Sequence, residues 1–123
     1  MTIMGAINHI DSIKPNRYEQ TEKIKWLSTL DGLVKAEIID THEGGEGVTF
    51  NGYDNMTALT TELLIPSPHD EVYIRWLEAQ IDYANGEYGK YNNSITMYNT
   101  AYSAFEKYYN RTHKPLSKNF THF

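Results

Sequence analysis

The feature that most constrains the fold is a run of apolar and aromatic residues with alternating spacings of four and three, which place side chains on one face of an α-helix. The run consists of Leu77, Ile81, Ala84, Tyr88, Tyr91, Ile95, Tyr98, Tyr102, Phe105 and Tyr109. Residues 85–89 contain an Asn-Gly pair and a second glycine, which interrupt helices. The pattern therefore predicts two helices joined by a turn or sharp kink, in preference to one straight helix. Ser67 as the N-cap and Pro68 as the first helical residue predict where the first of these two helices begins.

Two further helices are predicted in the first half of the chain. A short helix ends before Pro15, and its apolar face consists of Ile3, Ile7, Ile10 and Ile13. A longer helix covers residues 19–40, and its apolar stripe consists of Ile24, Leu27, Leu30, Val34 and Ile38. Trp26 and Leu33 widen this stripe. The solvent side of the longer helix is marked by Lys23, Lys25 and Lys35.

Residues 41–61, between the second and third predicted helices, lack a helical pattern. The preceding helix is ended by Gly44, Gly45 and Gly47. Asn51-Gly52 is a strong hairpin signal, so we expect either a small β-hairpin or an ordered loop here. The sequence thus predicts a mainly α domain of about four helices over residues 1–111, with this loop or β-hairpin excursion, followed by an extended C-terminal arm over residues 112–123.

Charge is unevenly distributed along the chain, whose net charge is −5. Eight acidic residues and no basic residue lie between Lys35 and Arg75. After Glu106 there is no acidic residue, and the basic residues are Lys107, Arg111, Lys114 and Lys118. One interpretation is a solvated acidic loop and a solvated basic tail. The other is a subunit whose acidic middle and basic end contact different neighbours.

Composition excludes several kinds of site and location. The absence of cysteine excludes disulfides and thiolate metal sites, and a reduced, intracellular setting is expected. The first fifteen residues have neither a basic start nor an apolar run long enough for a signal peptide or a membrane span. We therefore expect a soluble protein that makes no membrane contact. A length of 123 residues predicts a single domain.

The stretch Thr41–Asp54 contains a His-Glu pair, a third acid and three glycines before the Asn-Gly pair, and so resembles a metal or phosphate loop. A zincin helix needs a second His four residues after His42, but Glu46 stands there and glycines precede it. A phosphate loop needs a Lys after its glycines, and "GGEGV" has a carboxylate instead. The five His are scattered, and no Ser sits in a nucleophile elbow. We therefore predict no catalytic residue, metal or cofactor, and a surface excursion used for contact or channel lining.

Tyrosines are concentrated in the second half, where seven of the ten lie between Tyr83 and Tyr109. Such a stripe is either core packing or a contact between subunits, where aromatic rings with a polar tip are favoured. There are more phenol rings than a contact between two helices needs, so we predict a stripe that is partly intermolecular. The candidate interface residues are Tyr88, Tyr91, Tyr98, Tyr102 and Tyr109.

The C-terminal arm is polar, holds Pro115 and lacks a helical period. By itself it buries too little surface to offset the entropy lost on ordering. Basic groups beside apolar anchors suit a partner's groove with an acidic rim, which we favour over nucleic acid. The candidate anchoring residues are Arg111, Lys114, Leu116, Lys118, Phe120 and Phe123.

The order and spacing of these elements resemble the small head–tail connector (adaptor or neck) proteins of tailed bacteriophages. The resemblance rests on "LLIPSPHDEVYIRWLEAQIDYANGEYGKYNNSITMYNTAYSAFEKYYN", a Pro-led helix, a short Gly-containing turn and a second helix rich in Tyr and Phe. It extends to "KPNRYEQTEKIKWLSTLDGLVKAEI" in the first half. It covers roughly residues 2–112 and brings no catalytic residues with it.

The resemblance implies a structural virion protein that is made in the host cytoplasm and resides in the neck of the particle. Such proteins form a homo-oligomeric ring, commonly twelvefold, below the portal protein. The ring extends the DNA channel, through which DNA passes without sequence-specific binding, and docks the tail or a stopper protein. The arm would then anchor on the portal side. The alternative from another class is a small phage-encoded helical binding module or regulator, which would be a monomer or dimer.

Overall fold

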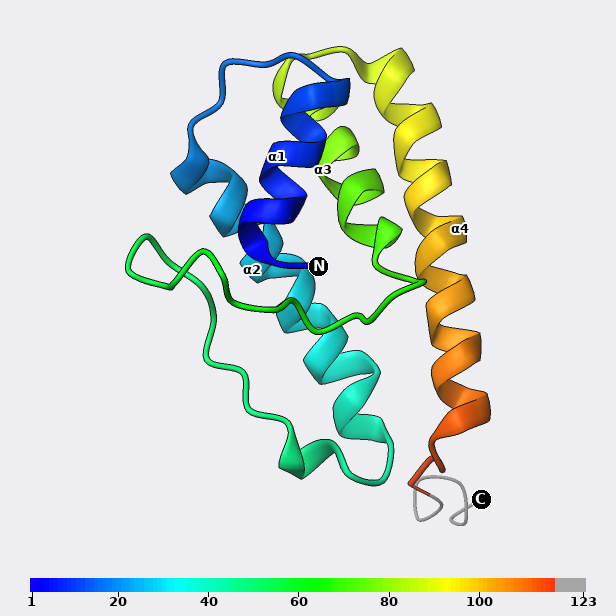
Figure 1. Ribbon diagram of the computed structural model, residues 1–123. Helices are drawn as coiled ribbons and strands as arrows, with labels where there is room; N and C mark the ends of the chain where they lie inside the picture. The colour runs from blue at the N-terminus through cyan, green and yellow to red at the C-terminus, as the bar shows by residue number, and fades with distance from the viewer. Residues whose placement is uncertain (117–123) are drawn as a thin grey trace.

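The protein is a bundle of four α-helices in a computed structural model that describes residues 1–116 (Figure 1). The helices are α1 (Ile3–Ile13), α2 (Gln20–Glu37), α3 (Glu71–Ala84) and α4 (Tyr88–Thr112). Two short 3-10 turns, Ile39–Thr41 and Gly45–Gly47, follow α2. Residues 1–116 contain two isolated β-bridges and no strand. The predicted mainly α domain of about four helices is confirmed.

Helix α3 lies at the centre of the bundle, because it contacts α1, α2 and α4. Its strongest contact is with α4, which runs antiparallel beside it (Figure 1). Helix α4 has 25 residues and α3 only 14, so the last turns of α4 extend beyond the start of α3. The fully buried core residues come from the predicted apolar faces and include Ile3, Ile10, Ile24, Leu27, Leu30, Val34, Leu77 and Ile81.

Within the predicted break at residues 85–89, the chain forms a full turn and not a kink, as one of the two predicted alternatives requires. The helices are separated by Asn85–Glu87, and the Gly86 backbone has φ of +74°. This left-handed conformation favours glycine, because in other residues the Cβ comes too close to the following carbonyl oxygen. The stripe predicted from spacing therefore continues from one helix to the next across a reversal of the chain.

The excursion between α2 and α3 is a loop and not a hairpin. Gly52 has the positive φ (+87°) that an Asn-Gly pair predicts, but the flanking segments do not pair with each other. Instead, the Tyr53 amide donates to Ser28 Oγ on α2 at 2.9 Å. Further along, the Ile3 amide at the start of α1 donates to the Thr61 carbonyl at 3.0 Å. Because the helices supply these partners, the excursion lies along their surface.

The predicted start of α3 is wrong by three residues. The Pro66 carbonyl accepts from the His69 amide at 2.9 Å, so the chain turns where Ser67 was expected to cap the helix. This turn brings the His69 ring within 5.9 Å of the Phe105 ring and 4.7 Å of the Tyr108 ring on α4, measured between centroids. Helix α3 begins at Glu71, two residues after the His69 ring that contacts α4.

The prediction that Lys23 lies on the solvent side is also wrong. Its side chain is packed beneath α1, where only 3% of the residue is exposed, and its Nζ lies 2.7 Å from Asp11 Oδ1. Partial burial acts to raise the pKa of Asp11, but hydrogen bonds from Lys23 and Asn16 lower that pKa overall. Leu33, predicted to widen the apolar stripe, is exposed.

Within residues 1–116, no helix is both long and apolar enough to cross a membrane.

Candidate interaction surfaces

A buried carboxylate, that of Asp31 on α2, links the excursion to the helices through hydrogen bonds. Asp31 is fully buried and accepts hydrogen bonds from Tyr73 Oη at 2.6 Å, Tyr53 Oη at 2.5 Å and the Leu64 amide at 3.0 Å. Tyr73 Oη in turn accepts from the Ile65 amide at 2.7 Å. These bonds fix the second half of the excursion against both α2 and α3.

Burial shifts the proton affinities of this network. It raises the pKa of Asp31, although the three donors act to lower it. The pKa values of Tyr53 and Tyr73 are also raised, by burial and by the adjacent carboxylate. Sequence reasoning missed Asp31, but a signal existed, because an acid four residues after Leu27 and three before Val34 stands on the apolar stripe. These hydrogen bonds link α2, α3 and the segment between them.

The far end of the excursion is a tight turn that presents an apolar side chain. The Met56 amide donates to Asp54 Oδ1 at 2.8 Å, and the Thr57 amide donates to the Asp54 carbonyl at 3.1 Å. The Asp54 amide donates to Thr57 Oγ1 at 2.9 Å. Met56 itself is 86% exposed. The turn therefore projects a thioether side chain into solvent from a backbone that is held by three hydrogen bonds.

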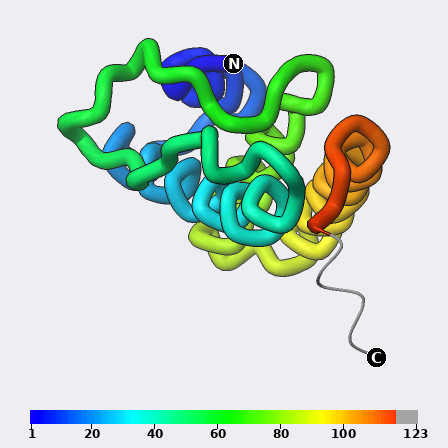
Figure 2. Tube along the Cα trace, turned by 90° about the horizontal axis from the view of Figure 1, so that it is seen from below, coloured from blue at the N-terminus to red at the C-terminus, as the bar shows by residue number. Residues whose placement is uncertain are grey.

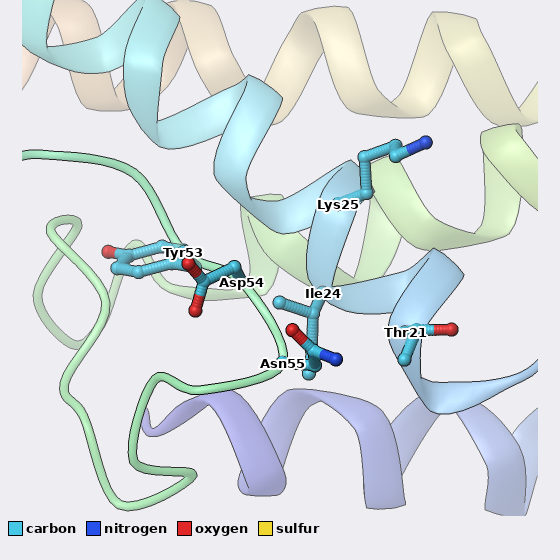
Figure 3. Close-up of a pocket in the computed structure, with 6 residues that line it drawn as sticks. All are labelled: Thr21, Ile24, Lys25, Tyr53, Asp54 and Asn55. Carbon is cyan, nitrogen blue, oxygen red and sulfur yellow. The ribbon is translucent and has the colours of Figure 1, made fainter.

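A crevice of about 230 Å³ lies between this turn and the first turns of α2 (Figure 3). It is lined by Thr21, Ile24, Lys25, Tyr53, Asp54 and Asn55. In Figure 3, Lys25 points away from Asp54. No group of three His, Cys, Asp or Glu side chains that could hold a metal ion occurs in the described part of the chain.

The predicted tyrosine stripe divides into two parts, of which the C-terminal part is used within the chain. Tyr98 is 7% exposed and packs on Trp76 with a centroid distance of 5.0 Å. Tyr102 Oη donates to Glu37 Oε1 on α2 at 3.0 Å. The Tyr109 ring lies 4.9 Å from the His42 ring. Burial, together with the nearby Glu37 charge, raises the pKa of Tyr98 to about 12.

The N-terminal part of the stripe faces solvent at the α3–α4 turn. Tyr88 is 59% exposed and Tyr91 is half-buried, and both rings pack against the exposed Tyr83, with centroid distances of 5.5 Å and 5.2 Å. We call Tyr83, Tyr88 and Tyr91 the outer tyrosine cluster. Within residues 1–116, no hydrogen bond to the chain uses the hydroxyls of these three residues. Of the five predicted interface tyrosines, only Tyr88 and Tyr91 thus belong to an open aromatic surface.

The start of the C-terminal arm pairs with the beginning of the excursion. The Glu43 amide donates to the Lys114 carbonyl at 2.8 Å, and the Leu116 amide donates to the Thr41 carbonyl at 3.1 Å. Between them His42 is buried, with Nδ1 2.6 Å from the Ile38 carbonyl oxygen and Nε2 2.7 Å from Asn110 Oδ1. The His-Glu pair thus joins two segments of the fold.

The structure places the predicted arm residues unequally. Arg111 and Lys114 are exposed, and Leu116 is half-buried. Lys118, Phe120 and Phe123 lie outside the described residues. Helix α4 continues to Thr112, so the arm begins one residue later than predicted, and its first residues are held by the chain's own excursion. Attachment of the arm to a partner stays a prediction.

One acidic residue of the excursion, Asp54, is separated in space from the basic residues of α4. The turn with Asp54 and Met56 lies on the side of α1 and α2, whereas α4 and its exposed Lys107 and Arg111 form the opposite side. Figure 2, seen from below, shows that the start of the excursion lies beside the C-terminal end of α4, where the Glu43 amide donates to the Lys114 carbonyl. The Asp54 end of the excursion, unlike its start, is remote from α4.

Comparison with protein-family models, with curated proteins and with solved structures finds no match to this chain.

Proposed function

We propose that this protein is a structural component of a tailed-phage particle, a head–tail connector subunit that forms a ring below the portal protein. The ring would extend the DNA channel and dock the tail or a stopper protein. The proposal draws on the order of elements that resembles the connector proteins. It is also supported by the helical body, whose described surface has patches suited to protein contacts and no recognisable catalytic group.

The observation that carries the proposal is that the Met56 turn with Asp54 and the surface of α4 with Lys107 and Arg111 lie on opposite sides of the subunit. A subunit that assembles head to tail needs two different, mutually complementary surfaces, because each copy presents one surface to each neighbour. Asp54 on the excursion and Lys107 and Arg111 on α4 have the charges for such a contact. Repetition of a heterologous contact by rotation gives a closed ring.

The test is assembly with the portal protein of the same phage. The purified protein and the portal would be mixed, and the complex examined by electron microscopy and by mass measurement in solution. We expect a ring of many subunits seated on one face of the portal. A protein that remains a monomer or dimer and leaves the portal bare would contradict the connector function.

A second candidate function, a small binding module or regulator, is favoured by one observation. The outer tyrosine cluster is a compact aromatic patch at one end of the molecule, and exposed aromatic patches mark protein contacts. A regulator would use this patch for one partner and would not assemble. The Tyr88→Ala variant separates the two functions, because it should abolish partner binding by a regulator and leave a ring based on α4 and the excursion intact.

A further inference from the structure

We propose that the Met56 turn of one subunit docks into a hollow on the outer face of α4 in a second copy of this chain. The inference rests on the proposed ring and names the contact between its subunits. It assigns this turn of the excursion to assembly, in preference to channel lining.

The receiving surface is a stretch of α4 without charge. From Tyr91 to Phe105 the helix has no Asp, Glu, Lys or Arg, although much of this stretch is exposed. Its solvent-facing residues include Asn92, Asn93, Thr96, Met97, Asn99, Thr100 and Ala104. The outer face of a helix that stays in water is normally charged, whereas the centres of interfaces are depleted of charge. Four turns of exposed, uncharged helix are therefore typical of a contact surface.

This face is hollowed at its C-terminal half. A depression of about 480 Å³ is lined by Thr96, Asn99, Thr100, Ser103, Ala104 and Lys107. The small side chains in its floor leave room for a side chain from another molecule. A second, adjoining depression of about 230 Å³ shares Thr100 and Ala104 with the first and adds the exposed Met97. The surface thus offers both space and apolar atoms.

The inserting group is Met56, the most exposed large apolar side chain in the described residues. Its turn is held by three hydrogen bonds around Asp54, and Tyr53 just before it is tied to Asp31. A preformed projection loses little conformational freedom on binding, which favours affinity. Methionine is unbranched and polarisable, so it adapts to an irregular hollow.

Charge complementarity points to a second copy as the occupant. Asp54 lies two residues before Met56 and is the one acid among residues 47–61. No acid lines the larger α4 depression, Lys107 forms part of its rim, and Arg111 follows one turn later, whereas the adjoining depression has both Glu71 and Arg75. Docking of Met56 would therefore bring a carboxylate towards two cations at the edge of the contact. Such rim charges orient the partners and speed their association.

Disulfide trapping tests this contact, and the absence of native cysteine makes it specific. The variant with Met56→Cys and Thr100→Cys would be oxidised both alone and with the portal protein, then analysed on denaturing gels. Because the contact is heterologous, each subunit links to two others, and we expect a ladder of covalent multimers that a thiol reductant removes. The matched control, Met56→Cys with Asn8→Cys on the exposed face of α1, should give no ladder.

A charge variant provides a second measurement. Lys107→Glu should weaken assembly about tenfold, whereas Arg17→Glu, which reverses an exposed charge between α1 and α2, should leave it unchanged. Multimers that form without the Met56–Thr100 ladder would overturn this contact and leave the connector function standing. An equal ladder from the Asn8 control would also overturn the contact. Failure to form any multimer, even with the portal, would overturn both the contact and the connector function.

Discussion

The two ends of the tyrosine stripe on α4 belong to one helical pattern but have different surroundings. At the C-terminal end, Tyr98 and Tyr102 meet Trp76 of α3 and Glu37 of α2. At the N-terminal end, the rings of Tyr88 and Tyr91 pack against Tyr83, and both Tyr83 and Tyr88 are exposed. The difference shows that a helical stripe specifies one face, and that the rest of the fold determines how much of this face is covered.

The cause of the difference is the geometry of the bundle. Helix α4 packs mainly on α3, and α2 reaches α4 only near its own C-terminal end, through Glu37 and the turn that follows. At the α3–α4 turn, Tyr18 Oη donates to Asn85 Oδ1 at 2.6 Å and Lys14 Nζ lies 2.8 Å from Asp82 Oδ1, yet the Tyr83 and Tyr88 rings stay exposed. The outer tyrosine cluster is thus left largely uncovered within the described chain.

The largest effect is expected when the covered ring is removed. Tyr98→Ala should lower the free energy of unfolding by about 3 kcal/mol, because it leaves a cavity between α3 and α4. Tyr88→Ala removes the same group at the open end and should change that free energy by no more than about 0.5 kcal/mol. Urea unfolding followed by circular dichroism measures both. Equal losses of unfolding free energy would show that the two ends of the tyrosine stripe are equally covered.

A smaller effect is expected when only a hydroxyl is removed. Tyr73→Phe deletes the donor to Asp31 and the acceptor for the Ile65 amide, both buried, and should cost about 2 kcal/mol. Tyr83→Phe removes a hydroxyl without a partner in the described chain and should be neutral. Protease cleavage within the excursion should also become faster in Tyr73→Phe. If both variants are as stable as the wild type, the hydrogen bonds around Asp31 do not stabilise the excursion.

The smallest effect concerns the turn that positions the outer tyrosine cluster. Gly86→Ala forces a side chain into a left-handed backbone and should cost about 1 kcal/mol, although no atom lies near the new Cβ. Gly89→Ala is the matched control, since this position is also open and its backbone is helical. It should be neutral or slightly stabilising. A thermal unfolding series distinguishes the two, and equal melting temperatures would argue against a backbone requirement at residue 86.

Periodicity and breaker residues predicted four helices, the turn at 85–89 and most of the core. They failed where a residue's partner comes from a distant segment. Lys23 was expected on the solvent side of its helix together with Lys25 and Lys35, yet it is buried and pairs with the exposed Asp11 of α1. His42 was expected on a surface loop, yet it is buried between Ile38 and Asn110.

The sequence by itself determined the helical class, the amphipathic faces and the separation of acidic from basic segments, because spacing and charge are local properties of the chain. Only the tertiary structure decided which tyrosines are covered, that Ser28 and Asp31 replace the partner strand of an expected hairpin, and that the Met56 turn and α4 lie on opposite sides. These outcomes depend on contacts between residues far apart in the chain. Local patterns carry no information about which distant group will satisfy a buried donor or cover an exposed ring.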